Sequence, residues 1–254
     1  MKPDRPAGNV GGMPSTASHL DASNVRDLLR TLAAALLPGR CLVCREAADA
    51  PYDLCTPCLA SLPWNAPSCP RCALPLLDVA DACAACPGRG GGLGPLLAVH
   101  GSFEYGAPVD DLLRRFKFRQ DLAAGATLSA LMARWPPPWL EGAALVPVPL
   151  HWRRLRERGY DQARELARPL ARSGGLRVWC GLRRARHTQA QSTLDAGERA
   201  HNLVGAFHVV GVPPARVIVV DDVMTTGATL AAAAGALRRA GAEEVRAWVC
   251  ARVP

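Results

Sequence analysis

Apolar residues beyond residue 95 form short runs that alternate with segments of helical period. Consecutive apolar residues, often β-branched, are typical of strands buried on both faces, as in a parallel sheet. Such runs occupy residues 96–103, 144–148, 176–182, 217–220 and 245–251. Apolar positions repeating every three to four residues predict helices, here over residues 109–118, 122–135, about 163–171 and 230–240. The alternation predicts an α/β domain with a parallel sheet flanked by helices, and it places Cys180 and Cys250 in strands of the core.

The chain before residue 95 has a different composition. Residues 1–22 are rich in Pro, Gly, Ser and Ala, and we expect a disordered tail. An apolar stripe predicts a helix over residues 25–37, which we expect to pack on the protein itself, with a membrane or partner helix as the alternative. The Gly-rich residues 87–95 are interpreted as a hinge. These features divide the chain into residues 1–22, 23–94 and 95–254.

The charge of the chain narrows the choice of partners only slightly. The formal net charge is +8, and only two of the 30 basic residues, Lys2 and Lys117, are lysines. Arginine suits phosphate recognition, so a polyphosphate or nucleic-acid ligand fits this balance, but compositional bias explains it equally well. Residues 1–20 show no secretory signal, and the apolar residues 28–37 are too few to span a bilayer. The cytoplasm is therefore the expected location.

Eight of the ten cysteines form four Cys-x-x-Cys pairs, each starting 14 residues after the previous one. Each pair supplies two thiolates to a tetrahedral Zn²⁺, so the sequence predicts two structural zinc sites of four cysteines each, formed by Cys41, Cys44, Cys55, Cys58, Cys69, Cys72, Cys83 and Cys86. Consecutive pairing closes smaller loops and is favoured over a cross-braced arrangement. A redox-active Cys-x-x-Cys is the alternative, but it normally stands in a βαβ unit that this segment lacks.

The most specific segment is residues 217–229, Val-Ile-Val-Val-Asp-Asp-Val-Met-Thr-Thr-Gly-Ala-Thr. Its four apolar residues predict a buried strand, and Asp221 and Asp222 stand where that strand is expected to end. A turn of small residues that opens a helix offers backbone N–H groups and a positive dipole end to an anion. Carboxylates accept hydrogen bonds from hydroxyl groups. Together these features predict a site for a ribose 5-phosphate.

A second basic segment follows the strand predicted at residues 144–148. Four arginines, Arg153, Arg154, Arg156 and Arg158, lie in what we interpret as a loop before the next helix. Such a loop suits pyrophosphate, with a solvated basic face as the alternative. Lys117, between two phenylalanines, is interpreted as a solvated lysine rather than a ligand contact. Residues 183–202 are polar without hydrophobic period, which predicts a long loop of the kind that often acts as a lid.

Residues 217–229 resemble the phosphoribosyl-pyrophosphate (PRPP) motif of type I phosphoribosyltransferases. With two further segments and the cysteine pairs, they resemble the ComF family, which is tied to DNA uptake in competent bacteria. The further segments are Val146-Pro-Val-Pro-Leu150 with Arg154, Arg158-Gly159-Tyr160 and Gln162, and Arg186-x-Thr188 with Gln191, Leu194, Arg199, Asn202 and Phe207. The cysteine pairs and Pro63-Trp64 look like the double zinc ribbon of this family. One departure is Ala73, where a ribbon usually carries Gly, which eases a positive φ.

The resemblance implies a type I phosphoribosyltransferase fold, a parallel sheet flanked by helices with a lid, preceded by a small double zinc-ribbon domain. It also implies that PRPP is the ligand. Asp221 and Asp222 would hold the ribose, and Met224, Thr225, Thr226, Gly227, Ala228 and Thr229 would hold the 5-phosphate. The pyrophosphate would lie on Pro147, Val148, Pro149, Leu150, Arg154 and Arg158, under a lid with Arg186, Gln191 and Arg199. Mg²⁺ would be bound mainly by PRPP itself, since it keeps waters and phosphate oxygens as ligands.

The resemblance further implies an accessory role in DNA uptake, with single-stranded DNA and competence proteins as partners. The DNA would be contacted through arginines and through exposed aromatic residues such as Trp64. The residues leave open whether the protein only binds PRPP or also transfers ribose 5-phosphate to a base or amine. Such a transfer depends on positioning and electrostatics rather than on a dedicated nucleophile.

Overall fold

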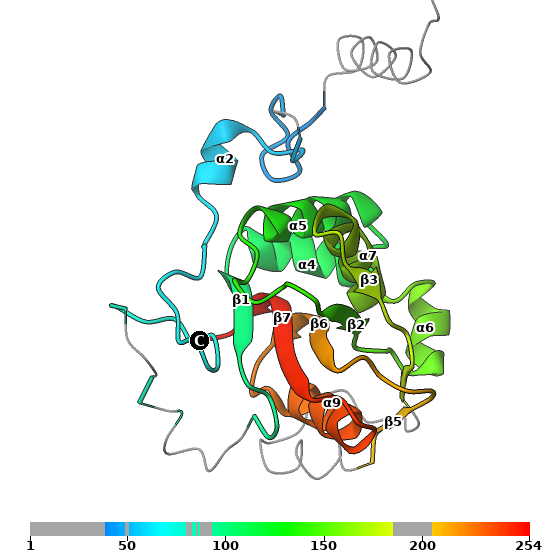
Figure 1. Cartoon of the computed structure of the whole chain (residues 1–254). Helices are drawn as coiled ribbons and strands as arrows, with labels where there is room; N and C mark the ends of the chain where they lie inside the picture. Colours follow the sequence, from blue (N-terminus) through cyan, green and yellow to red (C-terminus); the bar gives the residue numbers. More distant parts are fainter. Residues whose placement is uncertain (1–38, 49–50, 80–82, 85, 87–92, 185–204) are drawn as a thin grey trace, which may run out of the picture. The chain divides into compact units, whose positions relative to one another are not determined.

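The computed structural model describes residues 39–48, 51–79, 83–84, 86, 93–184 and 205–254, and Arg40–Pro254 forms one compact unit. Among the described residues, a five-stranded parallel sheet has the order β1-β7-β6-β2-β3 (Figure 1). Its strands are β1 (Val99–Glu104), β2 (Ala144–Pro147), β3 (Arg177–Val178), β6 (Arg216–Met224) and β7 (Glu244–Arg252). A separate antiparallel pair consists of β4 (Leu182–Arg184) and β5 (Phe207–Val209).

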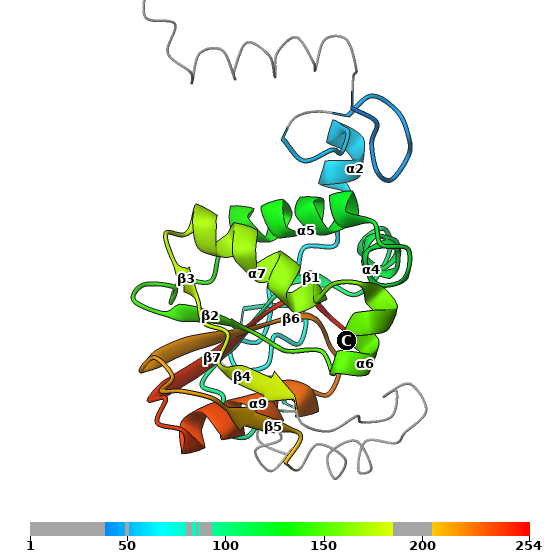
Figure 2. The ribbon, with the colours of Figure 1, turned by 90° about the vertical axis from the view of Figure 1, so that its right-hand side faces the viewer.

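Helices cover both faces of the parallel sheet (Figure 2). Because neighbouring residues of a strand point to opposite faces, β6 contributes to two cores. Ile218 and Val220 belong to the core under α4 (Val109–Phe118), α5 (Leu122–Arg134) and α7 (Gln162–Ser173), whereas Val217 and Val219 pack with α9 (Ala228–Arg239). All four side chains are at most 1% exposed. The predicted α/β architecture, with a parallel sheet between helices, is confirmed.

The single strand predicted at residues 176–182 is wrong. Trp179 still donates its N–H to Leu145 O beside β2, at 2.8 Å, but Gly181 O already accepts from Val210 N, also at 2.8 Å. A Cβ at Gly181 would lie 2.1 Å from the Trp179 ring and 2.5 Å from Val210 O. Only glycine therefore lets the chain leave the parallel sheet here and pair with β5. Cys180 is half-buried rather than in the core, whereas Cys250 is fully buried as expected.

The Arg-rich loop predicted after β2 is instead helix α6 (Trp152–Arg158). The side chain of His151 caps its start by accepting from Arg153 N at 3.3 Å. Gly159 ends it in the left-handed conformation, with φ of 80°, which glycine adopts without strain. A helix of seven residues is too short for its hydrophobic period to be recognised in a sequence.

Strand β6 also continues beyond its predicted end. Asp221 pairs with Val249, Val223 with Ala251, and Met224 with Arg252. The long neighbouring strand β7 supplies these partners, so the acidic pair lies inside a hydrogen-bonded strand. Asp221 and Asp222 therefore start from opposite faces of the sheet.

The second cysteine segment and the linker before it pack along β1. Trp64 forms a bridge with Phe103, and Glu104 N donates to Pro63 O at 2.8 Å. Arg252 of β7, only 4% exposed, donates to Cys72 O at 3.1 Å. The predicted tail, the helix over residues 25–37 and most of the hinge lie outside the described residues. Within the described chain, no helix has the length and apolar character needed to cross a membrane.

Candidate functional site

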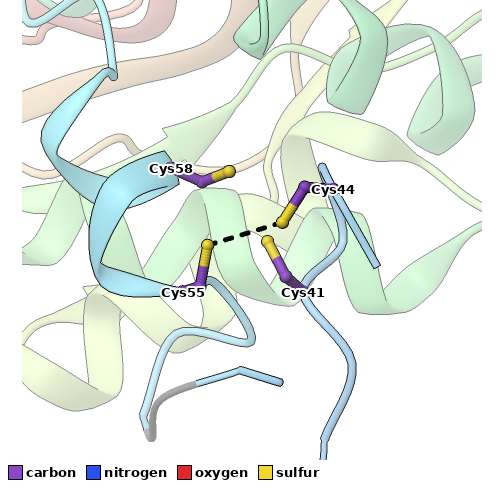
Figure 3. A group of neighbouring side chains, drawn as sticks. All are labelled: Cys41, Cys44, Cys55 and Cys58. Atoms are coloured by element: carbon purple, nitrogen blue, oxygen red, sulfur yellow. Dashed lines mark hydrogen bonds between the residues drawn. The ribbon is translucent and has the colours of Figure 1, made fainter. Parts of the chain in front are cut away.

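The eight paired cysteines form two groups of four. Within each group the sulfur atoms all lie within 4.8 Å of one another, and Figure 3 shows the sulfurs of Cys41, Cys44, Cys55 and Cys58 turned toward a common centre. The Sγ–Sγ distance is 3.5 Å for Cys44–Cys55 and 3.8 Å for Cys69–Cys86. Four sulfurs at about 2.3 Å from one zinc would stand about 3.8 Å apart. Both groups therefore fit a structural zinc ion.

The local backbone explains how each pair is presented. Cys41 N donates to Glu46 O at 2.7 Å and Cys69 N to Leu74 O at 2.9 Å, so the first cysteine of each group begins the same tight turn. The turn places Arg45 at φ of 71° and Ala73 at φ of 55°. Ala73 thus adopts the positive φ for which glycine was expected. Each group consists of two successive Cys-x-x-Cys pairs, so the consecutive pairing is confirmed.

A polar pocket of about 150 Å³ lies at the carboxyl ends of β2 and β6. In a parallel α/β sheet, ligands bind at this edge. The pocket is lined by Lys117, Val148, Pro149, Leu150, Arg154, Arg158, Gln162, Ala163, Arg184, Asp221, Asp222, Val223 and Thr229. Four cations face two carboxylates in this lining, so the pocket favours an anion that also carries hydrogen-bond donors.

The acidic pair is deeply set in this pocket. Asp222 is 7% exposed, and its Oδ2 lies 2.9 Å from Lys117 Nζ. Asp221 Oδ1 accepts from Asp222 N at 2.9 Å. Burial and then the charge of Asp222 raise the pKa of Asp221 to about 8, while Lys117 opposes the rise. Burial disfavours the charge of Lys117, but Asp222 prevails and raises the pKa of that lysine, which stays an ammonium.

Helix α6 presents two arginines to the pocket, and α7 begins beside them. Arg154 and Arg158 are half-buried toward the pocket, whereas Arg153 and Arg156 are exposed. Arg158 Nη1 donates to Gln162 Oε1 at 3.0 Å. Asp161, the N-cap of α7, accepts from Leu150 N at 2.9 Å and so connects the loop after β2 to α7.

The turn between β6 and α9 adjoins the pocket through Thr229. Gly227 is the N-cap of α9 with φ of 81°, and Thr226 Oγ1 accepts from Ala228 N at 3.4 Å. A Cβ at Gly227 would lie 2.8 Å from Met224 Cε. Met224 is 2% exposed, so its buried side chain supports the turn and does not face a ligand.

The predicted site residues are only partly brought together. The pocket lining includes Val148, Pro149, Leu150, Arg154, Arg158, Asp221, Asp222 and Thr229. Pro147 ends β2, and residues 224–228 form the end of β6, the adjoining turn and the start of α9. The predicted lid residues Arg186, Gln191 and Arg199 lie outside the described residues.

Sequence reasoning missed three charged or polar residues of the pocket: Lys117, Gln162 and Arg184. The interpretation of Lys117 as solvated is wrong, because its side chain is 23% exposed and paired with Asp222. Gln162 stands in the motif Arg158-Gly159-Tyr160-x-Gln162, which was a usable signal. Arg184 lay in the predicted loop of residues 183–202 without being singled out, and the structure places it and Arg183 in strand β4 instead. Lys117 had no signal, because it is far in sequence from the carboxylate that it faces.

A larger cavity of about 550 Å³ is mostly apolar and lies near the first cysteine group. It is lined by residues such as Leu59, Trp64, His100 and Trp135. Trp64 is half-buried, with its ring 4.6 Å from that of Phe103, so it is not the exposed aromatic residue that we expected. The cavity contains no acidic side chain and no cluster of cations in its described lining, so it lacks the charges that distinguish the smaller pocket.

Comparison with known proteins adds two domain matches. Residues 32–87 match the double zinc ribbon domain, and residues 197–254 match the phosphoribosyl transferase domain. The chain is 32% identical over 226 residues to the DNA utilization protein YhgH of Salmonella typhimurium, covering 85% of this chain and 98% of the relative. It is 31% identical over 231 residues to Competence protein F of Haemophilus influenzae, covering 84% of this chain and 96% of the relative.

Proposed function

Because the chain belongs to the ComF family, we propose that it is a cytoplasmic, PRPP-binding accessory factor in DNA uptake. The observation that carries the PRPP proposal is the pocket in which Lys117, Arg154, Arg158 and Arg184 face two carboxylates. PRPP presents phosphate groups and a ribose diol on one molecule. Cations attract its phosphates, while carboxylates accept hydrogen bonds from its hydroxyl groups.

Each part of PRPP has a complementary set of residues. Asp221 and Asp222 accept the ribose hydroxyls, and residues 225–229 bind the 5-phosphate at the start of α9. The loop of residues 147–150, together with Arg154 and Arg158, binds the pyrophosphate. Mg²⁺ enters with the ligand and keeps phosphate oxygens and waters in its shell.

Calorimetric titration of the full-length protein with Mg²⁺·PRPP tests this assignment. Above about pH 8, where Asp221 is ionised, replacing Asp221 and Asp222 together by alanine removes two charge-assisted acceptors, each worth about 1.5–3 kcal/mol. The sum of about 3–6 kcal/mol predicts that the affinity falls by at least about a hundredfold. Asp221→Asn and Asp222→Asn keep an acceptor and drop the charge, so they separate hydrogen bonding from electrostatics.

Asp110→Asn is the matched control, because Asp110 pairs with Arg114 on α4 and does not line the pocket. It should leave PRPP affinity unchanged. A folded wild-type protein with two bound zinc ions that fails to bind Mg²⁺·PRPP would refute the assignment.

The DNA part of the function is supported by a second surface. Trp152 at the start of α6 is 53% exposed, and the guanidinium groups of Arg153 and Arg156 lie 5.4 and 5.1 Å from its ring centre. An exposed aromatic ring beside arginines suits single-stranded DNA, whose bases stack while its phosphates are neutralised. The names of the relatives, DNA utilization protein and Competence protein F, point the same way. We propose that α6 contacts DNA and that competence proteins are partners.

Fluorescence anisotropy with a labelled oligonucleotide tests this surface. Trp152→Ala should weaken binding by about 1–3 kcal/mol, or about 5- to 150-fold, and wild-type affinity should fall steeply with salt. Trp135→Ala is the control, since Trp135 is also exposed but lies away from α6. Equal losses in both variants, or an affinity independent of salt, would exclude α6 as the DNA-binding surface.

A further inference from the structure

We propose that Lys117 is a positioning residue of the ribose site: its ammonium pairs with Asp222, increases the ionised fraction of the neighbouring Asp221, and orients the two carboxyl groups to accept two hydroxyl groups. The identity of the ligand as a ribose 5-phosphate rests on the proposed function, but the role of Lys117 toward the two carboxylates does not. No part of the PRPP motif contains this lysine, which comes from a helix more than 100 residues earlier in the chain.

Contacts of the two neighbouring phenylalanines fix the position of Lys117. Phe116, the preceding residue, is fully buried, and its backbone oxygen accepts from the hydroxyl of Tyr160. The rings of Phe116 and Tyr160 lie 5.4 Å apart. On the other side, the guanidinium of Arg158 lies 5.3 Å from the Phe118 ring centre. Phe116 and Phe118 therefore hold the end of α4 against Tyr160 and Arg158. Lys117 lies between these two phenylalanines, and from this position its side chain reaches Asp222.

The other titratable groups around Asp221 and Asp222 explain why this carboxylate pair needs a neighbouring cation. Asp161 at the start of α7 adds a third negative charge. Cys250 of β7, fully buried, offers no charge while it is a thiol, and burial raises its pKa. Arg184 of β4 interacts with Asp221, but it is also repelled by Arg154. Arg158 of α6 faces Lys117 itself. Within the described residues, Lys117 makes an ion pair with Asp222 of this group.

The consequence can be stated as a proton equilibrium. Burial and Asp222 raise the pKa of Asp221 to about 8, and Lys117 limits that rise. Without Lys117 the pKa of Asp221 rises further, so more of this group is protonated at neutral pH. A protonated carboxyl has lost acceptor capacity for the ribose hydroxyls. Removing Lys117 should therefore weaken the binding of the ligand strongly at neutral pH, and this loss of affinity should become smaller as the pH rises.

The first experiment measures Mg²⁺·PRPP affinity by calorimetry from about pH 7 to 9 for wild type, Lys117→Met and Lys117→Arg. An opposite charge shifts a pKa by at least about one unit, so Lys117→Met should bind about tenfold more weakly near pH 7 and only about twofold more weakly near pH 9. Taking the ratio to wild type at each pH cancels the titration of PRPP itself. Lys117→Arg keeps the charge and should restore most of the affinity.

The second experiment needs no ligand. Carbon-13 NMR of the Asp221 carboxyl, assigned by its disappearance in Asp221→Asn, should show its titration midpoint about one unit or more higher in Lys117→Met. Lys117→Gln serves if the methionine variant does not fold, and zinc content and melting temperature verify folding. A midpoint that does not move, or an affinity ratio that is the same at every pH, would overturn the role of Lys117. Wild-type protein that fails to bind PRPP would overturn the proposed function instead, and the NMR titration would still decide the inference.

Discussion

Gly227 offers a sharp test of how the turn before α9 is built. Its φ of 81° lies in the left-handed region, and an added Cβ would lie 2.7 Å from Leu93 Cδ2 and 2.8 Å from Met224 Cε. Replacing Gly227 by alanine therefore introduces both backbone strain and steric overlap. We expect the protein to unfold at a lower temperature and the adjoining 5-phosphate segment to lose its geometry.

The magnitude follows from these two effects. A non-glycine residue in the left-handed region costs about 1–2 kcal/mol. Overpacking costs about 1–3 kcal/mol. The lower part of this range applies here, because both contacting atoms lie at the ends of flexible side chains. Together they give about 2–4 kcal/mol. At about 2–4 °C per kcal/mol for a domain of this size, the melting temperature should fall by about 4–16 °C.

Gly235→Ala is the matched control on the same helix. Gly235 lies inside α9, and a Cβ there would meet only the mobile guanidinium of Arg239, at 3.2 Å. Alanine in a helix interior is better than glycine by about 0.5–1 kcal/mol, so this variant should melt slightly higher than wild type. The assay is scanning calorimetry on zinc-loaded protein. A Gly227→Ala variant that melts within about 1 °C of wild type would refute the strain argument, as would an equal loss in both variants.

Two further predictions concern the metal sites and the response to acid. Metal analysis should find two zinc ions per chain, and Cys44→Ser should reduce this to one and unfold the first ribbon while PRPP binding persists; disulfides in place of zinc in fresh protein would contradict it. Burial works against the charge of Asp121, but hydrogen bonds from Ala124 N–H and Arg115 lower its pKa. Its contribution to stability is therefore complete above the unfolded value of about 3.9 and lost as the pH falls below it. Asp121→Asn should lose less stability than wild type between about pH 5 and pH 3 in chemical denaturation, and parallel curves for the two proteins would contradict this.

Local patterns in the sequence predicted much of this protein. Apolar runs predicted the parallel sheet, because a strand buried on both faces has consecutive apolar residues. Helical periods predicted the covering helices, because a helix buried along one stripe has apolar residues every three to four positions. The even spacing of the cysteines predicted two groups of four cysteines and their consecutive pairing, since short loops join neighbouring pairs. The strand, acidic pair and turn of residues 217–229 predicted an anion site at the end of a strand, which is where β6 and α9 meet.

Other features depended on contacts between distant segments. The strand β6 extends past its apolar run because β7 offers pairing partners up to Arg252, and the chain leaves the sheet at Gly181 because β5 competes for pairing. Lys117 looked like a surface lysine, since nothing in its own helix reveals that Asp222 lies 2.9 Å from its ammonium. The sequence alone determined most of the strands and helices and the grouping of the cysteines, because these depend mainly on neighbours a few positions away. It did not determine helix α6 or the break in the strand at Gly181. Only the tertiary structure decided which charges face one another in the pocket, because that depends on how α4, α6 and β4 pack around the end of β6.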